Sequence, residues 1–133
     1  MALEFLYLSQ EDMIKAGVLD MKKCVATMDE VFQLLGKGDY VMGGPYENHH
    51  GMMLWFPIEK RPGTKIPVAG PDRRVMCMPA YLGGRFDVIG NKWYGSNCEN
   101  AKKGLPRSIL TVNINDANTG APLAFMSANL LSS

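Results

Sequence analysis

The order in which helix-like and strand-like patterns occur along the chain restricts its fold more than any other feature. Apolar residues at helical spacing form one continuous stripe in the first third, which consists of Met21, Cys24, Val25, Met28, Val31, Phe32 and Leu35. From Gly43 onward, short apolar runs alternate with Gly, Pro and Asn, a texture typical of strands joined by turns. The strand–helix–strand alternation of a nucleotide-binding parallel sheet is missing. We therefore expect an α+β fold in which N-terminal helices pack on a mostly antiparallel sheet.

Two helices are expected before the strands begin. Ser9 is suited to cap a short helix, with Asp12 at the position where a capping box places Glu or Gln. Asp20 is a good N-cap for a second, longer helix that contains the apolar stripe. Gly36 and Gly38 are expected to end this helix.

Five segments are expected to be strands, and they cover residues 52–56, 75–78, 86–94, 108–115 and 123–126. The fourth alternates apolar and polar residues most clearly, and the turn-forming residues 116–120 after it predict a hairpin with the fifth. A Pro- and Gly-rich loop, residues 57–71, separates the first two strands and is interpreted as an insertion or a lid.

Length and charge exclude several classes of protein. The 133 residues are enough for one domain with a core, which we expect to span 1–133. The net charge of +1, with acids and bases interspersed, provides no field to attract nucleic acid or a membrane surface. Cys24, Cys77 and Cys98 are an odd number without a C-x-x-C pair, which argues against disulfides and a zinc site. A cytoplasmic location is therefore expected.

Two short motifs resemble ligand sites but lack the necessary context. Gly36-Lys-Gly38 follows a helix and lacks a third glycine and a following helix, so no dinucleotide site is expected in this chain. A metal site at His49-His50 would need further ligands, and no Cys/His cluster supplies them. The two histidines are interpreted as loop residues with ordinary hydrogen bonds, with contact to a substrate as the alternative.

Three basic residues are candidates for carboxylate binding. Arg73 and Arg74 immediately precede a strand, and the planar guanidinium group suits bidentate binding of a carboxylate, although both side chains could equally be solvated. Alternation along 86–94 places Lys92 on one face, together with Phe86, Val88, Gly90 and Tyr94. If that face is the inner one, the ammonium group is partly desolvated and needs an acidic partner, such as a substrate carboxylate. A surface lysine is the alternative.

Three segments, in a specific order and spacing, resemble the ornithine cyclodeaminase/mu-crystallin family over most of the chain. They are Met78-Pro-Ala-Tyr81, then Gly90-Asn-Lys92 with Asn97 downstream, then Gly104-Leu-Pro106 leading to Asp116-x-x-Thr-Gly120-x-Pro-Leu-Ala124-x-Met126. The resemblance implies a substrate-binding and dimerisation domain, followed in complete members by a Rossmann domain that holds NAD or NADP. It also implies hydride exchange between the nicotinamide and the Cα of an amino acid or its imine, as in the conversion of L-ornithine to L-proline and ammonia.

Carried onto this sequence, the resemblance implies a catalytic and substrate-binding role for Lys92, which matches the family lysine at the substrate carboxyl or imine group. The family arginine that clamps the carboxylate lies upstream of the Met-Pro-Ala-Tyr segment, where this chain departs from the pattern at residues 46–51. The candidates to replace it are Arg73, Arg74, His49 and His50. This departure leaves the identity of the amino-acid substrate open.

The resemblance also implies what lies outside this chain. Residue 133 falls just before a family segment with a further arginine and the nucleotide loop. We expect the Rossmann domain to lie elsewhere in the same protein or in a companion chain, and expect no NAD(P) binding or turnover by this chain alone. The expected partners are an amino-acid substrate and a second copy, paired through the sheet. The alternative is a non-catalytic ligand-binding or dimerisation module derived from the family.

Overall fold

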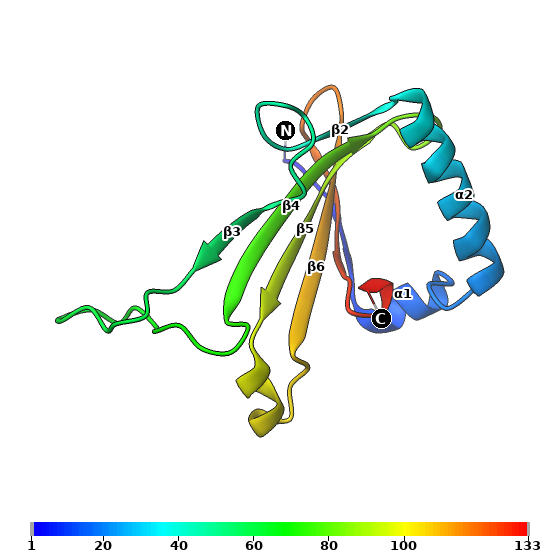
Figure 1. The fold of residues 1–133 in the computed structure, drawn as a ribbon. Helices are drawn as coiled ribbons and strands as arrows, with labels where there is room; N and C mark the ends of the chain where they lie inside the picture. Colours follow the sequence, from blue (N-terminus) through cyan, green and yellow to red (C-terminus); the bar gives the residue numbers. More distant parts are fainter. Residues whose placement is uncertain (1, 133) are drawn as a thin grey trace.

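The structure, a computed structural model, describes residues 2–132. Seven strands form one sheet in the order β1-β7-β6-β5-β4-β2, and β3 pairs with β4 as well (Figure 1). Their bounds are β1 Leu6–Leu8, β2 Tyr40–Met42, β3 Met52–Trp55, β4 Arg74–Leu82, β5 Val88–Ser96, β6 Ser108–Asp116 and β7 Pro122–Ser127. Neighbouring strands are antiparallel, except that β1 and β7 are parallel. The expected α+β fold with a mostly antiparallel sheet is confirmed.

The helices begin where the capping residues predict. The hydroxyl of Ser9 accepts a hydrogen bond from the Asp12 amide, and the Asp12 carboxylate accepts one from the Ser9 amide, so α1 (Gln10–Lys15) has a complete capping box. The Asp20 carboxylate caps α2 (Met21–Lys37). Of the two glycines expected to end α2, only Gly38 does so, with a left-handed φ of 76°. Gly36 lies within the helix, which continues to Lys37.

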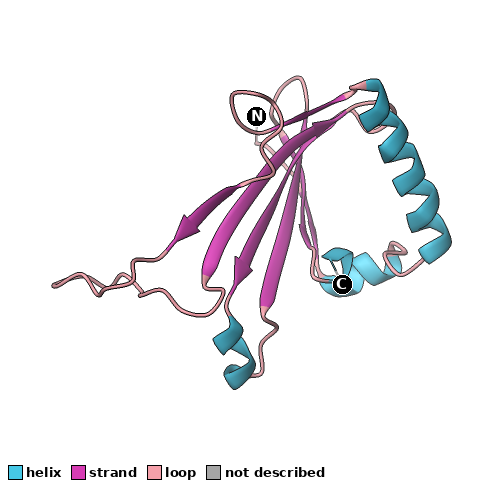
Figure 2. Ribbon diagram, in the orientation of Figure 1, coloured by secondary structure: helices cyan, strands magenta, loops and turns pink. Residues whose placement is uncertain are grey.

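The two helices differ in how they meet the sheet. α1 contacts β1 and β7, and its Met13 forms a small core with Ala124 and Met126 of β7. α2 lies to the side of the sheet and does not cover its strands (Figure 2). Of the stripe-bearing helix, only Leu34 is buried, whereas Val25 is 66% exposed. The expected packing of helices on the sheet therefore describes α1, and α2 contributes little to it in the single chain.

The C-terminal half of α2 is attached to the β4–β5 turn. A Cβ built on Gly84 in this turn would lie 2.8 Å from Cδ2 of Leu34, so the helix and the turn are in close contact there. The guanidinium group of Arg85 pairs with the Glu30 carboxylate at 2.8 Å. Among residues 2–132, α2 is the longest helix, and neither its 17 residues nor its hydropathy allow it to cross a membrane.

Each of the five expected strands is present, with changed ends. β4 continues to Leu82, beyond the expected end at residue 78, because its second half pairs with β2. β5 begins at Val88, so Phe86 lies in the preceding turn and not on the strand face expected for it. The short strands β1 and β2 were not predicted. The loop 57–73 extends away from the sheet and from α2 (Figure 1), and two 3-10 helices, η1 (Cys98–Lys103) and η2 (Leu130–Ser132), follow β5 and β7.

Candidate functional site

The sheet has an inner face, defined here as the side against which α1 packs, and an outer face on the opposite side. Met126, which packs on α1, is paired with Val112, and Val112 is paired with Lys92. Directly paired residues of antiparallel strands project to the same side of a sheet. Lys92 therefore lies on the inner face, whereas its neighbour Trp93 projects to the outer face and is 51% exposed.

Lys92 lies between apolar neighbours at the middle of β5. It is half-buried and is paired with Met78 of β4 on one side and Val112 of β6 on the other. Among residues 2–132, no carboxylate forms an ion pair with its ammonium group. A half-buried charge without a partner is unfavourable unless a ligand or solvent compensates it. The position leaves Lys92 available for an anion that approaches the inner face.

A cluster of polar side chains occupies the end of the inner face where β5 ends and β4 and β6 begin. We call it the Asp72 cluster, and its members are Asp72, Arg74, Tyr94, Ser96, Arg107 and Ser108. Oδ1 of Asp72 lies 2.6 Å from Nη1 of Arg74. Its Oδ2 accepts hydrogen bonds from the Ser96 hydroxyl and from Nη1 of Arg107. The hydrogen bond from Ser96 lowers the pKa of Asp72 from 3.8, and the two guanidinium groups lower it further.

Tyr94 connects this cluster to the middle of the inner face. Its hydroxyl accepts hydrogen bonds from Ser108 at 3.1 Å and from Nη1 of Arg107 at 3.4 Å. These interactions lower the pKa of Tyr94 from 10.0, and the hydrogen bond from Ser108 has the largest effect. Tyr94 lies two residues from Lys92 on the same face of β5, so polar groups continue from the cluster to the lysine.

Arg74 is held between two aromatic rings on the inner face. Its guanidinium carbon lies 5.5 Å from the centre of the Trp55 ring and 5.8 Å from that of Tyr94, which are cation–π distances. Its Nε is buried and has no hydrogen-bond partner among residues 2–132. Arg74 is paired with Ser96, so its Cα lies about 13 Å along the sheet from the level of Lys92.

The structure separates Arg73 from these groups. Nη1 of Arg73 donates to the carbonyl oxygen of Val68 at 3.0 Å, and its guanidinium carbon lies 5.3 Å from the centre of the Phe56 ring. Both contacts are with the loop 57–73 and the segment that leads into it. Of the two arginines named from the sequence, Arg74 is the one that shares the inner face with Lys92.

His49 and His50 lie in the connection between β2 and β3, the two strands that pair with β4 on the side away from β5. Both are exposed, and the backbone of His49 forms an isolated bridge with Gly43. The His49 ring lies against Gly44, where an added Cβ would meet Cγ of the ring at 2.4 Å. Within residues 2–132, no three His, Cys, Asp or Glu side chains are placed to hold a metal ion.

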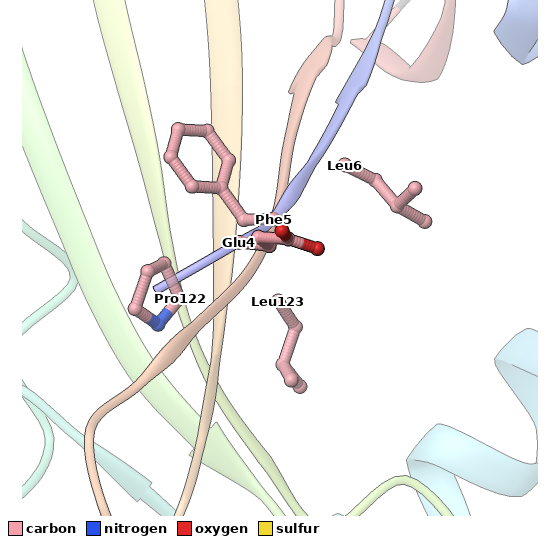
Figure 3. Close-up of a pocket in the computed structure, with 5 residues that line it drawn as sticks. All are labelled: Glu4, Phe5, Leu6, Pro122 and Leu123. Carbon is pink, nitrogen blue, oxygen red and sulfur yellow. The ribbon is translucent and has the colours of Figure 1, made fainter. Parts of the chain in front are cut away.

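A shallow cavity at the β1–β7 edge lacks the groups that would make it a site. Its volume is about 260 Å³ and it is lined by Glu4, Phe5, Leu6, Pro122 and Leu123. Figure 3 shows one carboxylate, that of Glu4, among side chains that are otherwise apolar. Lys92 and the Asp72 cluster bring charged and polar groups together on one face of the sheet, and they are the candidate site.

Sequence reasoning identified Lys92 and Arg74 but missed the rest of this cluster. Arg107 and Asp72 are separated by 35 residues in the chain, and no local pattern links them. The one available signal is that Tyr94 and Ser96 follow Lys92 at alternate positions of the same strand, which places all three on one face.

The fold is an α+β domain with a mostly antiparallel sheet, and comparisons with known proteins are consistent with this class. A family model described as ornithine cyclodeaminase/mu-crystallin family matches residues 17–133. The chain therefore belongs to the ornithine cyclodeaminase/mu-crystallin family. The chain is similar to N-((2S)-2-amino-2-carboxyethyl)-L-glutamate dehydrogenase from Staphylococcus aureus, with 29% sequence identity. The match covers 98% of this chain and 35% of that protein.

Two solved structures share the fold. One is an archaeal alanine dehydrogenase dimer with bound NAD, with a TM-score of 0.72 and 26% identity over 96% of this chain and 32% of the other. The second is Thermococcus litoralis Δ1-pyrroline-2-carboxylate reductase in complex with NADH and L-proline, with a TM-score of 0.73 and 25% identity over 96% and 33% of the two chains. The chain spans about a third of the length of these relatives.

The residues described do not form a cradle for the nicotinamide cofactor that the two solved structures contain. Within residues 2–132, no glycine-rich loop connects a strand to a helix, since Gly36 is inside α2 and Gly38 leads into β2.

Proposed function

We propose that this chain is the substrate-binding part of an NAD(P)-dependent amino-acid cyclodeaminase or dehydrogenase, which acts on an amino acid or the corresponding imino acid. The observation that carries the proposal is the half-buried Lys92, which lacks an acidic partner within residues 2–132 and lies on the inner face. The named relatives support it, because alanine, proline and the substituted glutamate each carry an amino-bearing carbon next to a carboxylate. Conversion of L-ornithine to L-proline and ammonia is one member of this class.

In this proposal Lys92 binds the carboxylate or imine region of the substrate. A carboxylate seated beside Met78 and Val112 would lose part of its hydration, and the ammonium group compensates for that loss by a charge-assisted hydrogen bond. Arg74 is the preferred replacement for the clamping arginine of the family, because it shares the inner face with Lys92. Arg73, His49 and His50 remain substrate-binding hypotheses that no contact with Lys92 or the Asp72 cluster supports.

The activity is tested by a screen of amino acids against the complete protein, in which NADH or NADPH fluorescence reports turnover. We expect oxidation of at least one L-amino acid, or reduction of its imino acid, in the presence of one of the two cofactors. Tight amino-acid binding without turnover would support the alternative, a non-catalytic ligand-binding module. Absence of both binding and turnover would contradict the proposal. The proposed domain for the cofactor lies elsewhere in the protein or in a companion chain, and the proposed location is the cytoplasm.

We further infer a homodimer that forms through the outer face of the sheet. This face exposes large apolar side chains across its central strands, among them Ile89, Trp93, Ile109 and Phe125 at 37–51% exposure. Exposed apolar surface of this kind is typical of an interface. The archaeal alanine dehydrogenase, with a related fold, is described as a dimer.

Trp93→Lys is expected to shift the protein from dimer to monomer, because it places a charge at the centre of the outer face. Sedimentation velocity measures the change. Leu19→Lys is the matched control, since Leu19 is 58% exposed and lies between the helices, away from the sheet. A dimer that persists in Trp93→Lys, or a native protein that is monomeric at high concentration, would rule out this interface.

A further inference from the structure

The Asp72 cluster has more positive charge than its own carboxylate neutralises. Arg74 and Arg107 share the single carboxylate of Asp72, and no other acidic side chain within residues 2–132 forms an ion pair with either guanidinium group. We propose that Arg107 is a second anion-binding position, which takes the side-chain carboxylate of an acidic amino-acid substrate. This inference rests on the proposed function, since it assumes that Lys92 binds the α-carboxylate or imine end.

Arg107 has the donors that such a role requires. Its side chain is 55% exposed, so a ligand can reach it. Nη1 makes all of its hydrogen bonds to Asp72, Tyr94 and Ser96, which leaves Nε and Nη2 without partners in the chain from residue 2 to residue 132. A guanidinium edge formed by Nε and Nη2 matches the two oxygens of a carboxylate. The bonds at Nη1 hold the group in place, so less rotational freedom is lost when a ligand binds.

Arg107 and Lys92 are connected through Tyr94 on the inner face. Nη1 of Arg107 lies 3.4 Å from the Tyr94 hydroxyl, and Tyr94 is two residues from Lys92, or about 7 Å along the strand. Both cations therefore border the same stretch of the inner face. In this proposal, an acidic amino acid directs its α-carboxylate to Lys92 and its side-chain carboxylate to Arg107.

A second observation indicates that an acceptor from outside residues 2–132 belongs at this end of the inner face. Nε of Arg74 is buried without a hydrogen-bond partner, although buried donors are nearly always satisfied in folded proteins. Asp72 adopts a left-handed φ of 51°, a conformation that non-glycine residues rarely adopt and that often accompanies functional sites. The cluster thus combines an unsatisfied donor, a strained residue and excess positive charge.

The test compares L-glutamate with L-glutamine, which have nearly the same shape and differ in side-chain charge. Dissociation constants are measured by calorimetry on the complete protein in the presence of its cofactor. We expect the native protein to prefer L-glutamate by about tenfold or more, as one charge-assisted bidentate contact allows. Arg107→Gln is expected to remove this preference, and Arg107→Lys to retain part of it. Lys103→Gln, an exposed neighbour in η1, changes the net charge equally and is expected to leave the preference intact.

The outcomes distinguish a failure of this inference from a failure of the proposed function. Equal affinity of the native protein for the two amino acids, or an unchanged preference in a folded Arg107→Gln variant, overturns the role of Arg107 and leaves the proposed function in place. If Arg107→Gln fails to fold, the Arg107→Lys variant decides the question, because a full native preference in it would also overturn the bidentate contact. Absence of binding by any amino acid in the screen overturns the proposed function and this inference together.

Discussion

Replacing Lys92 with Met is expected to weaken amino-acid binding by the complete enzyme by about 10- to 100-fold, the range for loss of a hydrogen bond between charged groups. Methionine keeps most of the side-chain volume between Met78 and Val112, so the sheet should fold as before. Cofactor affinity is expected to stay the same, because the described residues do not form a nucleotide loop. Calorimetry with the amino acid and, separately, with the cofactor measures the two affinities.

The matched control is Lys103→Met, which makes the same chemical change at an exposed lysine of η1. It is expected to alter neither affinity. Native-like amino-acid affinity in the Lys92→Met variant would remove Lys92 from the site. An equal loss of amino-acid and cofactor affinity would instead indicate a general disturbance of the fold.

Replacing Asp72 with Asn is expected to destabilise the chain at neutral pH by about 1–2 kcal/mol, a modest figure because Arg107 is largely exposed. The Asp72 carboxylate accepts hydrogen bonds from Ser96 and Arg107 and pairs with Arg74, and a neutral amide cannot compensate the two guanidinium groups. Asparagine tolerates the left-handed backbone at this position. The effect should therefore reflect the charge and not backbone strain. Thermal melting of the native and variant proteins measures it.

The pH dependence of this difference has a definite sign. The pKa of Asp72 is lowered from 3.8 in the folded state, first by the hydrogen bond from Ser96. The stabilisation by the charged carboxylate is thus present above about pH 4 and is lost as the pH falls below 3.8 through the folded-state pKa. The gap between native and Asp72→Asn melting temperatures should close over that range. Asp29→Asn, at an exposed helix position, is the control, and a gap that does not depend on pH would argue against the ion-pair explanation.

The helices show how far local sequence patterns determine this structure. Ser9 and Asp20 cap the two helices as predicted, because each cap depends on contacts within three residues. Which of the two glycines, Gly36 or Gly38, ends α2 did not depend on local contacts in this way. A helix tolerates an interior glycine, and the chain leaves the helical path at Gly38, just before Asp39, which then accepts a hydrogen bond from the distant Gly84 amide.

Whether a strand could be predicted from the sequence depended on its length and on its partners. The alternation along β5 and β6 was visible in the sequence, because each strand has nine residues. β1 and β2 have three residues each, too few for a periodic pattern. They exist because β7 and the second half of β4 offer unpaired backbone groups to them. The extension of β4 past Pro79 has the same origin.

By itself, the sequence determined the α+β class, the caps, the turn-bounded strands and the alternation that puts Lys92 and Tyr94 on one face, since each depends on neighbours along the chain. Only the tertiary structure decided that this face is the inner one and that Arg74, not Arg73, shares it. It also brought Asp72 and Arg107 together across 35 residues. Such contacts depend on strand register, which links distant residues through backbone pairing and the packing of α1, and a one-residue change of register would turn every side chain to the other face.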